Sequence, residues 1–395
     1  MDLHHTVTHG KHYRRRTRRR GIALGLGAVA LAAVVVGALL WSGGSGSPEP
    51  QAGAAATSAG VGEHAPGAHA GDAAAPSGPA ASSAAPAPAA SAAEPGVGPA
   101  VPVGSSPHHL AVTPDGRSAY VADPVLGAVL RIDPDTAEVT ATIPVPQAPP
   151  QMVTTSPDGS RVFVSAYDEE FTTDAVVTID TATDTVAGAV PVGRGPYAMA
   201  TDPGGRLLYV PYYDEDHLDV LDAATGALVD RVDVAPSPHW VAFVPGREAA
   251  YVTNHFSDVV TVLSLEDHRV LATVPVSDGP HALETSPDGT RIAVVGYISD
   301  DVTLIDPATD TVVATVPGVG AGPQDVTWAP DGRHLYTANV EDGTVAVVDA
   351  ATGAVTARIP TGTDPTSVTV TPDGRRLLVT NSGDGTVRVL DVAGT

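Results

Sequence analysis

The residues best suited to chemistry recur in the sequence one position after a proline. They carry imidazole, amide, phenol or hydroxyl groups: His108, Gln151, Tyr197, His239, His281, Gln324 and Thr366. Such groups bind polar ligands through hydrogen bonds, and an imidazole can also act as a general base. His239 and His281 are therefore the candidates for a catalytic base, with water as nucleophile. The alternative is that these histidines only cap backbone carbonyls at strand ends.

A second group of residues lies where the next apolar run of each unit ends: Asp123, Ala166, Tyr212, Asn254, Gly296, Asn339 and Asn381. The loops that follow are rich in carboxylates and aromatic rings. From both groups and these loops we predict a ligand site formed by His108, Tyr197, Tyr212, His239, Asn254, His255, His281, Gln324, Asn339 and Asn381. Two alternatives stay open, because asparagines tolerate left-handed turns and acidic loops can be a solvated surface.

The composition of these loops favours a cationic or neutral polar ligand. Carboxylates attract cations and aromatic faces add cation–π attraction, whereas Arg194 is the one clear basic residue in the loops. A phosphorylated substrate would need more basic groups. Because no His-x-His, HExxH, P-loop, Rossmann or GxSxG pattern occurs, we predict no metal site and no cofactor.

The elements that position these residues are short β-strands. The stretch Gly320 to Thr361 contains four alternating apolar runs, at Asp325 to Trp328, His334 to Ala338, Thr344 to Val348 and Val355 to Ile359. Turn residues bound each run, which is typical of a four-stranded antiparallel meander. One such sheet has two apolar faces and needs neighbours to cover them.

The neighbours are copies of the same unit. The proline of the first turn recurs at Pro114, Pro157, Pro203, Pro245, Pro287, Pro330 and Pro372, with spacings of 43, 46, 42, 42, 43 and 42 residues. A period in the forties with four strands per unit indicates a propeller blade. Seven turns predict an all-β, seven-bladed β-propeller, and large residues six positions after the proline, such as Tyr251, are expected to pack between blades.

The last unit ends near Leu390 after only three strands. The segment Val101-Pro102-Val103-Gly104 resembles the strands that end other units, such as Val190-Pro191-Val192-Gly193. An N-terminal strand that pairs into the C-terminal blade would close the ring and remove an open sheet edge. We therefore place the propeller at residues 97–395.

The units resemble the YVTN-type β-propeller repeat, which includes lactonase-like and surface-layer-like propellers. Tyr251-Val252-Thr253-Asn254 spells the motif, Asn339 and Asn381 keep its last residue, and Pro280 to Gly289 follows the related pattern PHxxxxSPDG. The resemblance covers about three quarters of the chain. It implies the propeller fold, and it leaves open an extracellular binding protein, a lactonase-like enzyme or a redox-enzyme subunit.

The N-terminus predicts a membrane anchor. Residues 1–20 form a basic tail with seven Lys and Arg residues, and residues 21–41 are uncharged and rich in Ala, Val and Leu. As a helix, this run would span roughly 31 Å, the thickness of a bilayer core. The basic cluster favours a cytoplasmic N-terminus and an extracellular propeller. An uncleaved signal anchor is preferred over a cleaved signal peptide, because no small-x-small site follows the run.

Residues 42–96 are mainly Ala, Gly, Pro and Ser, which predicts a disordered linker with a reach of about 40 Å. Outside the basic tail the chain has 14 basic and 44 acidic residues, a balance that argues against nucleic-acid binding. It has no cysteine and only one lysine, Lys11, which excludes disulfides, thiol catalysis and a lysine nucleophile in the propeller.

Three functions remain open from the sequence. The first is a monomeric, membrane-anchored binding module whose partner is an extracellular protein, a cell-wall component or a small polar or cationic ligand. The second is a lactonase-like hydrolase that uses His239 or His281. The third is a propeller subunit of a redox enzyme, although the sequence offers no cofactor ligands for it.

Overall fold

The structure is a computed structural model that describes residues 87–168 and 170–394. These residues form strands, turns and connecting segments, without a helix, and hence without a helix that could cross a membrane. The predicted tail, the predicted membrane anchor at 21–41 and most of the predicted linker lie outside the described residues.

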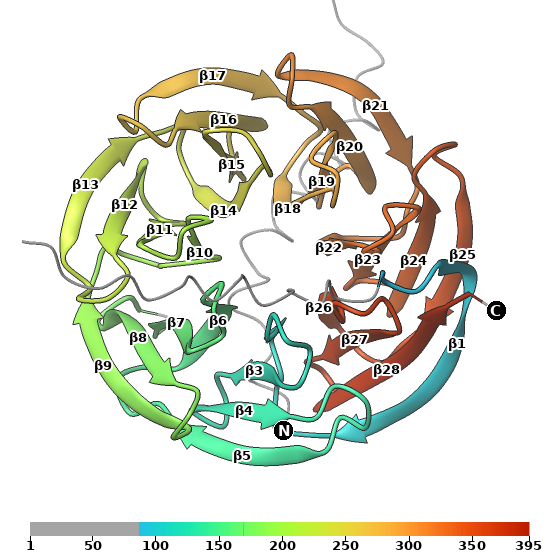
Figure 1. Cartoon of the computed structure of the whole chain (residues 1–395), viewed down its shortest axis with the longest axis horizontal. Coiled ribbons are helices and arrows are strands. Elements are labelled where there is room, and N and C mark those ends of the chain that lie inside the picture. The colour runs from blue at the N-terminus through green and yellow to red at the C-terminus, as the bar shows by residue number, and fades with distance from the viewer. Residues whose placement is uncertain (1–86, 169, 395) are drawn as a thin grey trace, which may run out of the picture. The chain divides into compact units, whose positions relative to one another are not determined.

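The described residues fold into seven four-stranded antiparallel sheets arranged as the blades of a propeller, as the sequence predicts (Figure 1). Blades 1 to 3 consist of β2 (His109–Val112), β3 (Ala119–Asp123), β4 (Ala128–Ile132) and β5 (Val139–Pro144); β6 (Pro150–Thr155), β7 (Arg161–Tyr167), β8 (Asp174–Asp180) and β9 (Thr185–Pro191); and β10 (Ala200–Thr201), β11 (Leu207–Pro211), β12 (His217–Asp222) and β13 (Leu228–Asp233).

Blades 4 to 6 repeat this order. They consist of β14 (Pro238–Phe243), β15 (Ala249–Asn254), β16 (Val259–Ser264) and β17 (Val270–Pro275); β18 (Pro280–Thr285), β19 (Ile292–Gly296), β20 (Asp301–Asp306) and β21 (Thr311–Pro317); and β22 (Pro323–Trp328), β23 (His334–Asn339), β24 (Thr344–Asp349) and β25 (Val355–Pro360). Blade 7 consists of β26 (Pro365–Val370), β27 (Arg376–Asn381), β28 (Thr386–Ala393) and the N-terminal β1 (Ser91–Pro102).

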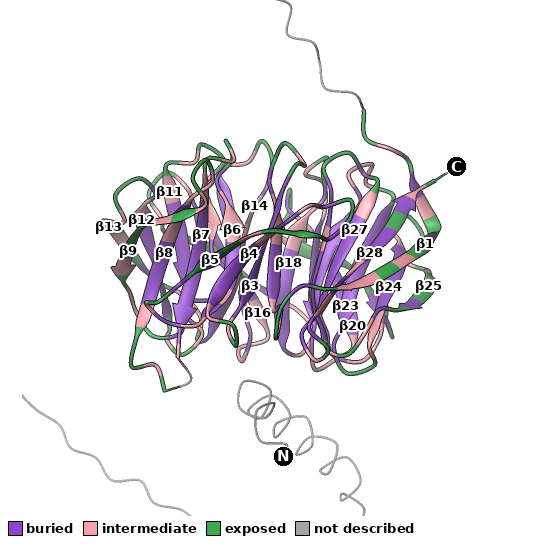
Figure 2. Ribbon diagram, turned by 90° about the horizontal axis from the view of Figure 1, so that it is seen from below, coloured by how far each residue is buried: buried purple, intermediate pink, exposed green. Residues whose placement is uncertain are grey.

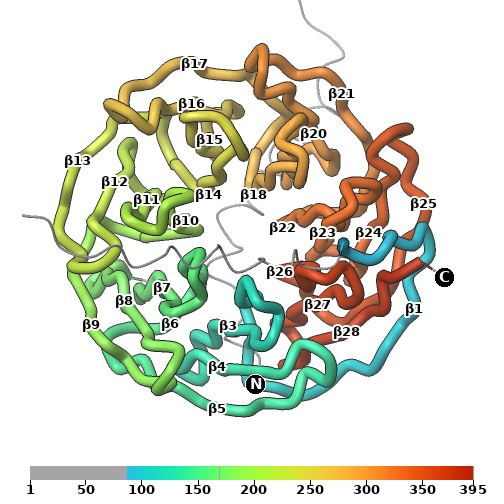
Figure 3. Tube along the Cα trace, viewed as in Figure 1, coloured from blue at the N-terminus to red at the C-terminus, as the bar shows by residue number. Residues whose placement is uncertain are grey.

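Burial changes systematically from the axis of the ring to its rim. The first strands surround the axis, and the fourth strands run around the outside (Figure 3). The second strands are almost fully buried, whereas a fourth strand such as β5 is mostly exposed and buries only Ile143 (Figure 2). The apolar core therefore lies between blades, where Tyr120, Tyr209, Tyr251 and Tyr336 are at most 1% exposed. This confirms the packing role predicted for the residue six positions after the turn proline.

The N-terminal strand β1 pairs with β28 and closes the ring, but it begins earlier than the sequence predicts. Residues 91–96, which the sequence assigns to the linker, belong to this strand. Their Ala- and Ser-rich composition resembles a linker, yet Ser91 is buried and binds blade 6. Its backbone N–H donates to Asp331 Oδ2 at 2.6 Å, and its hydroxyl lies 2.7 Å from His334 Nδ1.

Candidate ligand-binding site

One end of the central channel, which we call the channel mouth, is where the first strands begin. The residues that follow the proline at the start of each first strand lie there: His108, Gln151, Tyr197, His239, His281, Gln324 and Thr366. In blades 2, 4, 5, 6 and 7 the pairing between the first two strands shifts register directly after the proline. His239, for example, lies between the paired residues Pro238 and Trp240. Such a β-bulge changes the direction of the side chain it contains. The repeated bulge therefore explains how these blades present a side chain at the mouth instead of burying it in the sheet.

His239 and His281 form the centre of the site. Their Nε2 atoms lie 3.2 Å apart, and their side chains are 1% and 3% exposed. One of the facing nitrogens must donate and the other accept, so the contact fits one proton between them. The ring of Tyr197 packs on His239 with a centroid distance of 3.8 Å and lies 5.8 Å from His281. The structure thus brings together three of the predicted site residues from three successive blades.

The backbone around Tyr197 helps to hold this arrangement. The first strand of blade 3, β10, has only two residues, but the segment before it stays bonded to its own blade, where the Tyr197 N–H donates to the carbonyl of Pro211 at 2.9 Å. Ala198 forms an isolated parallel bridge to Trp240 of blade 4, and its N–H donates to the carbonyl of His239 at 3.1 Å. Tyr197 is therefore fixed between its own blade and blade 4.

Aromatic residues from the loops after the second strands surround this centre. His255 lies 5.0 Å from His239 and 5.4 Å from His281, and Tyr213 lies 5.7 Å from His239, as centroid distances. Further ring contacts extend the group to nine rings from blades 2 to 5, which we call the mouth cluster: Tyr167, Phe171, Tyr197, Tyr213, His239, His255, Phe256, His281 and Tyr297.

The phenols of the mouth cluster are neutral and lie beside carboxylates. Burial raises the pKa of the phenols of Tyr167, Tyr197 and Tyr213, so these hydroxyls remain protonated donors at neutral pH. Burial also raises the pKa of the nearby Asp174. Arg194 lies 5.2 Å from the ring centre of Phe171 and 3.4 Å from Asp214, so a cation already occupies one aromatic face at the edge of the cluster.

Gln324 approaches the cluster from blade 6. Gln324 is 6% exposed. Its hydrogen bond with Tyr197 lowers the pKa of that tyrosine, whereas burial raises it more strongly. Its Oε1 atom is buried without a hydrogen-bond partner among the described residues. A buried acceptor of this kind is satisfied by a donor from water or a ligand. The mouth therefore offers an acceptor next to the aromatic rings.

Other residues predicted for the site lie elsewhere. Asn254, Asn339 and Asn381 are fully buried, and their amides bond to nearby segments of the chain. Asn254, for example, donates to the carbonyl of Ala235, which precedes its blade, at 2.6 Å and accepts from Thr261 at 2.7 Å. Tyr212 is also fully buried and donates to Asp219 at 2.9 Å. The asparagines thus tie the end of the second strand to neighbouring segments, and none of the three has the left-handed backbone that the sequence left open as the alternative.

His108 lies beside blades 2 and 7 and not in the mouth cluster. Its Nδ1 lies 3.0 Å from the carbonyl oxygen of Gln151, and its own carbonyl accepts from Thr366 and Thr380. For His108 the structure therefore matches the alternative of a histidine that satisfies a backbone carbonyl. His108 lies outside the cluster because it belongs to blade 1, whereas the rings of the cluster belong to blades 2 to 5.

The sequence reasoning missed the residues that close the channel beneath the mouth. Trp240 of blade 4 meets His109 of blade 1, with ring centroids 5.3 Å apart, and thereby crosses the channel. A cavity of about 390 Å³ is lined by Trp240, His109 and further first-strand residues, including two carboxylates, Glu284 and Asp325. The alternation of side chains along the first strands could have identified these residues, because residues two positions apart point to the same face of a sheet.

The groups in this channel cavity have strongly shifted pKa values. Burial raises the pKa of Glu284 to about 8 and that of Asp325 to about 6. Burial and the neighbouring His108 lower the pKa of His109 to about 3. The cavity is therefore lined by a neutral imidazole and a protonated Glu284 at neutral pH. Within the described residues, no group of three or more His, Asp or Glu side chains has the arrangement of a metal site.

Comparisons with known proteins agree with this architecture. Residues 127–395 match the family described as "Lactonase, 7-bladed beta-propeller". A solved structure described as Kuenenia stuttgartiensis hydrazine synthase is similar in fold, with a TM-score of 0.65 and 21% identity over 74% of this chain and 97% of that chain. A search of curated protein sequences gives no match. At this identity the structural similarity concerns the fold alone.

Proposed function

Because the chain belongs to the lactonase family of seven-bladed β-propellers, we propose that it uses the channel mouth, the face at which the loops of blades 2 to 5 meet. The proposed function is a binding module that takes a cationic or neutral polar ligand there. The observation that carries the proposal is the mouth cluster itself, in which nine His, Tyr and Phe rings from four blades are linked by pairwise ring contacts.

The chemistry of the cluster supports this ligand class. Electron-rich ring faces attract cations, and the attraction increases when water is excluded. Tyr213, Phe171 and Phe256 are only partly buried, so their rings are accessible to a ligand. Arg194 over Phe171 is an internal example of the same contact. The buried acceptor of Gln324 and the protonated tyrosine hydroxyls add hydrogen-bonding groups for a polar ligand.

The cellular setting is part of the proposal. The basic residues 1–20 and the uncharged run 21–41 support a single-pass anchor with the N-terminus in the cytoplasm and the propeller outside the cell membrane. The proposed ligand is then an extracellular protein, a cell-wall component or a small polar or cationic molecule. Protease protection of a C-terminal tag in intact cells tests this topology, since an extracellular propeller is cut and a cytoplasmic one is protected.

A lactonase-like hydrolase is the second candidate, and the contact between His239 and His281 favours it. A pair of imidazoles whose facing nitrogens lie 3.2 Å apart can accept a proton from water and share it. The family to which the chain belongs is also named for this activity. No observation among the described residues favours the third candidate, a redox-enzyme subunit, beyond the fold that it shares with the hydrazine synthase structure.

One experiment separates the two candidates. The purified full-length chain is analysed for bound metal and screened for hydrolysis of δ-lactones and aryl esters. The same assay is applied to the double variant His239→Ala and His281→Ala and to the control His268→Ala, a histidine that binds Asp230 away from the mouth. The binding module predicts no turnover by any form. Hydrolysis that disappears in the double variant and persists in the control would replace it with the hydrolase.

A further inference from the structure

The contacts between neighbouring blades differ from one junction to the next at the end of the ring opposite the mouth. At two junctions a tyrosine of one blade donates to an aspartate in the last turn of the next blade. Tyr120 reaches Asp184 at 3.2 Å, and Tyr251 reaches Asp310 at 2.5 Å. An arginine completes each contact, since Arg131 lies 2.9 Å from Asp184 and Arg247 lies 2.8 Å from Asp310. Aromatic and ionic groups thus fill these junctions.

The junction between blades 2 and 3 lacks these groups. Phe163 stands where the other two blades carry tyrosine, so no hydroxyl is available. Gly226 stands where Asp184 and Asp310 stand, and it has the same left-handed backbone, with φ of 72° against 53° for both aspartates. The turn geometry is therefore conserved within the repeat, while the carboxylate that would fill the junction is absent.

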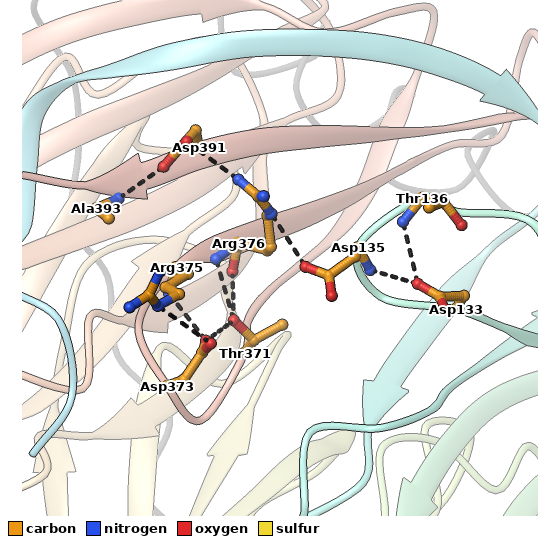
Figure 4. Close-up of polar contacts among 9 residues, drawn as sticks. All are labelled: Asp133, Asp135, Thr136, Thr371, Asp373, Arg375, Arg376, Asp391 and Ala393. Atoms are coloured by element: carbon orange, nitrogen blue, oxygen red, sulfur yellow. Dashed lines mark hydrogen bonds and ion pairs between the residues drawn. The ribbon is translucent and has the colours of Figure 1, made fainter. Parts of the chain in front are cut away.

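Arg161 at this junction forms no salt bridge within the described residues, whereas Arg376, at the same position of the repeat between blades 7 and 1, forms two. There, Arg376 pairs with Asp391 of its own blade at 3.1 Å and with Asp135 of the next blade at 3.2 Å (Figure 4). Arg161 occupies the same position of the repeat, but Ala224 replaces the cross-junction aspartate. Arg161 donates one N–H to the carbonyl of Ala223 at 2.8 Å and has no salt bridge within the described part of the chain.

The missing side chains leave a cavity. It has a volume of about 400 Å³ and is lined by Arg161 and Phe163 from blade 2 and by Leu208, Leu221 and the turn at Ala223 to Gly226 from blade 3. Its floor is apolar, because Phe163, Leu208 and Leu221 are almost fully buried. The outer strand β9 contributes Ala187, Gly188, Ala189 and Val190, and because the first three are small and exposed, the cavity is accessible from outside.

We propose that this cavity, the junction pocket, binds a small apolar carboxylate, with the carboxylate on Arg161 and the apolar body over Phe163 and Leu208. A guanidinium has five N–H donors in a planar fork that matches a carboxylate. The bond to Ala223 uses one donor and fixes the side chain. The ligand carboxylate takes the place that Asp135 has beside Arg376.

The two aspartates at the pocket do not replace such a ligand. Asp180 Oδ1 accepts from Ala182 and Thr183 in its own turn. Asp222 Oδ1 likewise accepts from the backbone N–H groups of Ala224 and Thr225 and from the Thr225 hydroxyl. The two bonds from Thr225 lower the pKa of Asp222 more than the charge of Arg161 does. Each carboxylate thus bonds backbone N–H groups of its own turn, and neither forms a salt bridge with Arg161 within the described residues.

The test uses benzoate as the probe and the full-length chain as the protein. Titration calorimetry measures binding of benzoate, of neutral benzamide and of acetate, which lacks the apolar body. We expect benzoate to bind more tightly than either analogue. Arg161→Gln should weaken benzoate binding about tenfold or more, as expected for loss of a charge-assisted hydrogen bond. Arg291→Gln, the same position in blade 5, is the matched control and should leave it unchanged.

A second variant keeps the test decisive if Arg161→Gln does not fold. Ala224→Asp adds a carboxylate at an exposed turn position, where Asp135 stands in blade 1. It should pair with Arg161, compete with benzoate and weaken its binding by a similar factor, with an unchanged or higher urea midpoint. The proposal is overturned if benzoate does not bind, if Ala224→Asp leaves its affinity unchanged, or if Arg291→Gln weakens it equally.

Discussion

Replacing Glu284 by glutamine should remove a pH dependence of stability that the channel cavity imposes. The Oε2 atom of Glu284 accepts the backbone N–H of Trp328 at 2.5 Å, and its backbone carbonyl accepts the indole N–H of the same residue at 3.1 Å. Burial among the first strands raises the pKa of this carboxyl from 4.5 to about 8. Glutamine preserves the shape and the acceptor oxygen of the protonated acid, but it does not titrate.

The sign of the effect follows from where the proton is held. Between pH 4.5 and 8 the folded protein keeps the proton on Glu284, whereas the unfolded chain releases it. Stability is therefore fully present below pH 4.5 and is lost as the pH rises to about 8. Each pKa unit corresponds to about 1.4 kcal/mol, so the whole shift sets an upper limit on the order of 5 kcal/mol. Because Glu284 lines a cavity that admits water, we expect roughly half of this limit.

The assay is urea denaturation of the full-length chain from pH 6 to pH 8.5. The window begins at pH 6 because Asp325, with a pKa raised to about 6, contributes its own slope below that value in both proteins. The stability advantage of Glu284→Gln over the wild type should grow across this window and reach about 2 kcal/mol at pH 8.5. The exposed Glu138→Gln serves as control and should follow the wild type. Parallel curves for Glu284→Gln and the wild type would refute the reasoning.

Two further predictions concern the junctions and the closure of the ring. Tyr251→Phe should lower the free energy of unfolding by about 1–2 kcal/mol, because it removes the hydrogen bond to Asp310. Tyr209→Phe should have no cost, because the buried Tyr209 hydroxyl has no partner among the described residues; equal losses in urea denaturation would contradict this difference. Ser91→Ala should cost about 1–2 kcal/mol, since its hydroxyl bonds Asp331 and His334. A cost near zero for Ser91→Ala would mean that residues 91–96 do not hold the closing strand in place.

The repeat made the ring predictable, because turn prolines and strand periods are local signals that recur seven times. The same register predicted that Tyr197, His239 and His281 share one end of the channel. The repeat register did not distinguish residues of the first strands, which face the channel axis, from residues at the ends of the second strands, which lie farther from it. Asn254 ends a second strand and Tyr212 follows one, and both side chains are buried away from the mouth, where buried polar groups need partners.

Other features arise from residues that no local pattern connects. The start of β1 at Ser91 depends on contacts with Asp331 and His334, more than two hundred residues away in sequence. Trp240 closes the channel because it meets His109 from a blade across the ring. The junction pocket exists because Phe163, Ala224 and Gly226 are small or apolar where other blades carry polar groups. Only the comparison of all junctions in three dimensions makes these differences visible.

The central claim is that the mouth cluster binds a cationic or polar ligand, and titration with tetramethylammonium tests it most directly. Calorimetry on the full-length chain should detect binding that weakens about tenfold or more in the double variant Tyr213→Ala and Phe256→Ala, because each lost ring removes a cation–π contact. Leu126→Ala, an exposed residue in the corresponding loop of blade 1, is the control and should bind as the wild type does. Equal affinity of all three proteins, or no binding by any of them, would contradict the account.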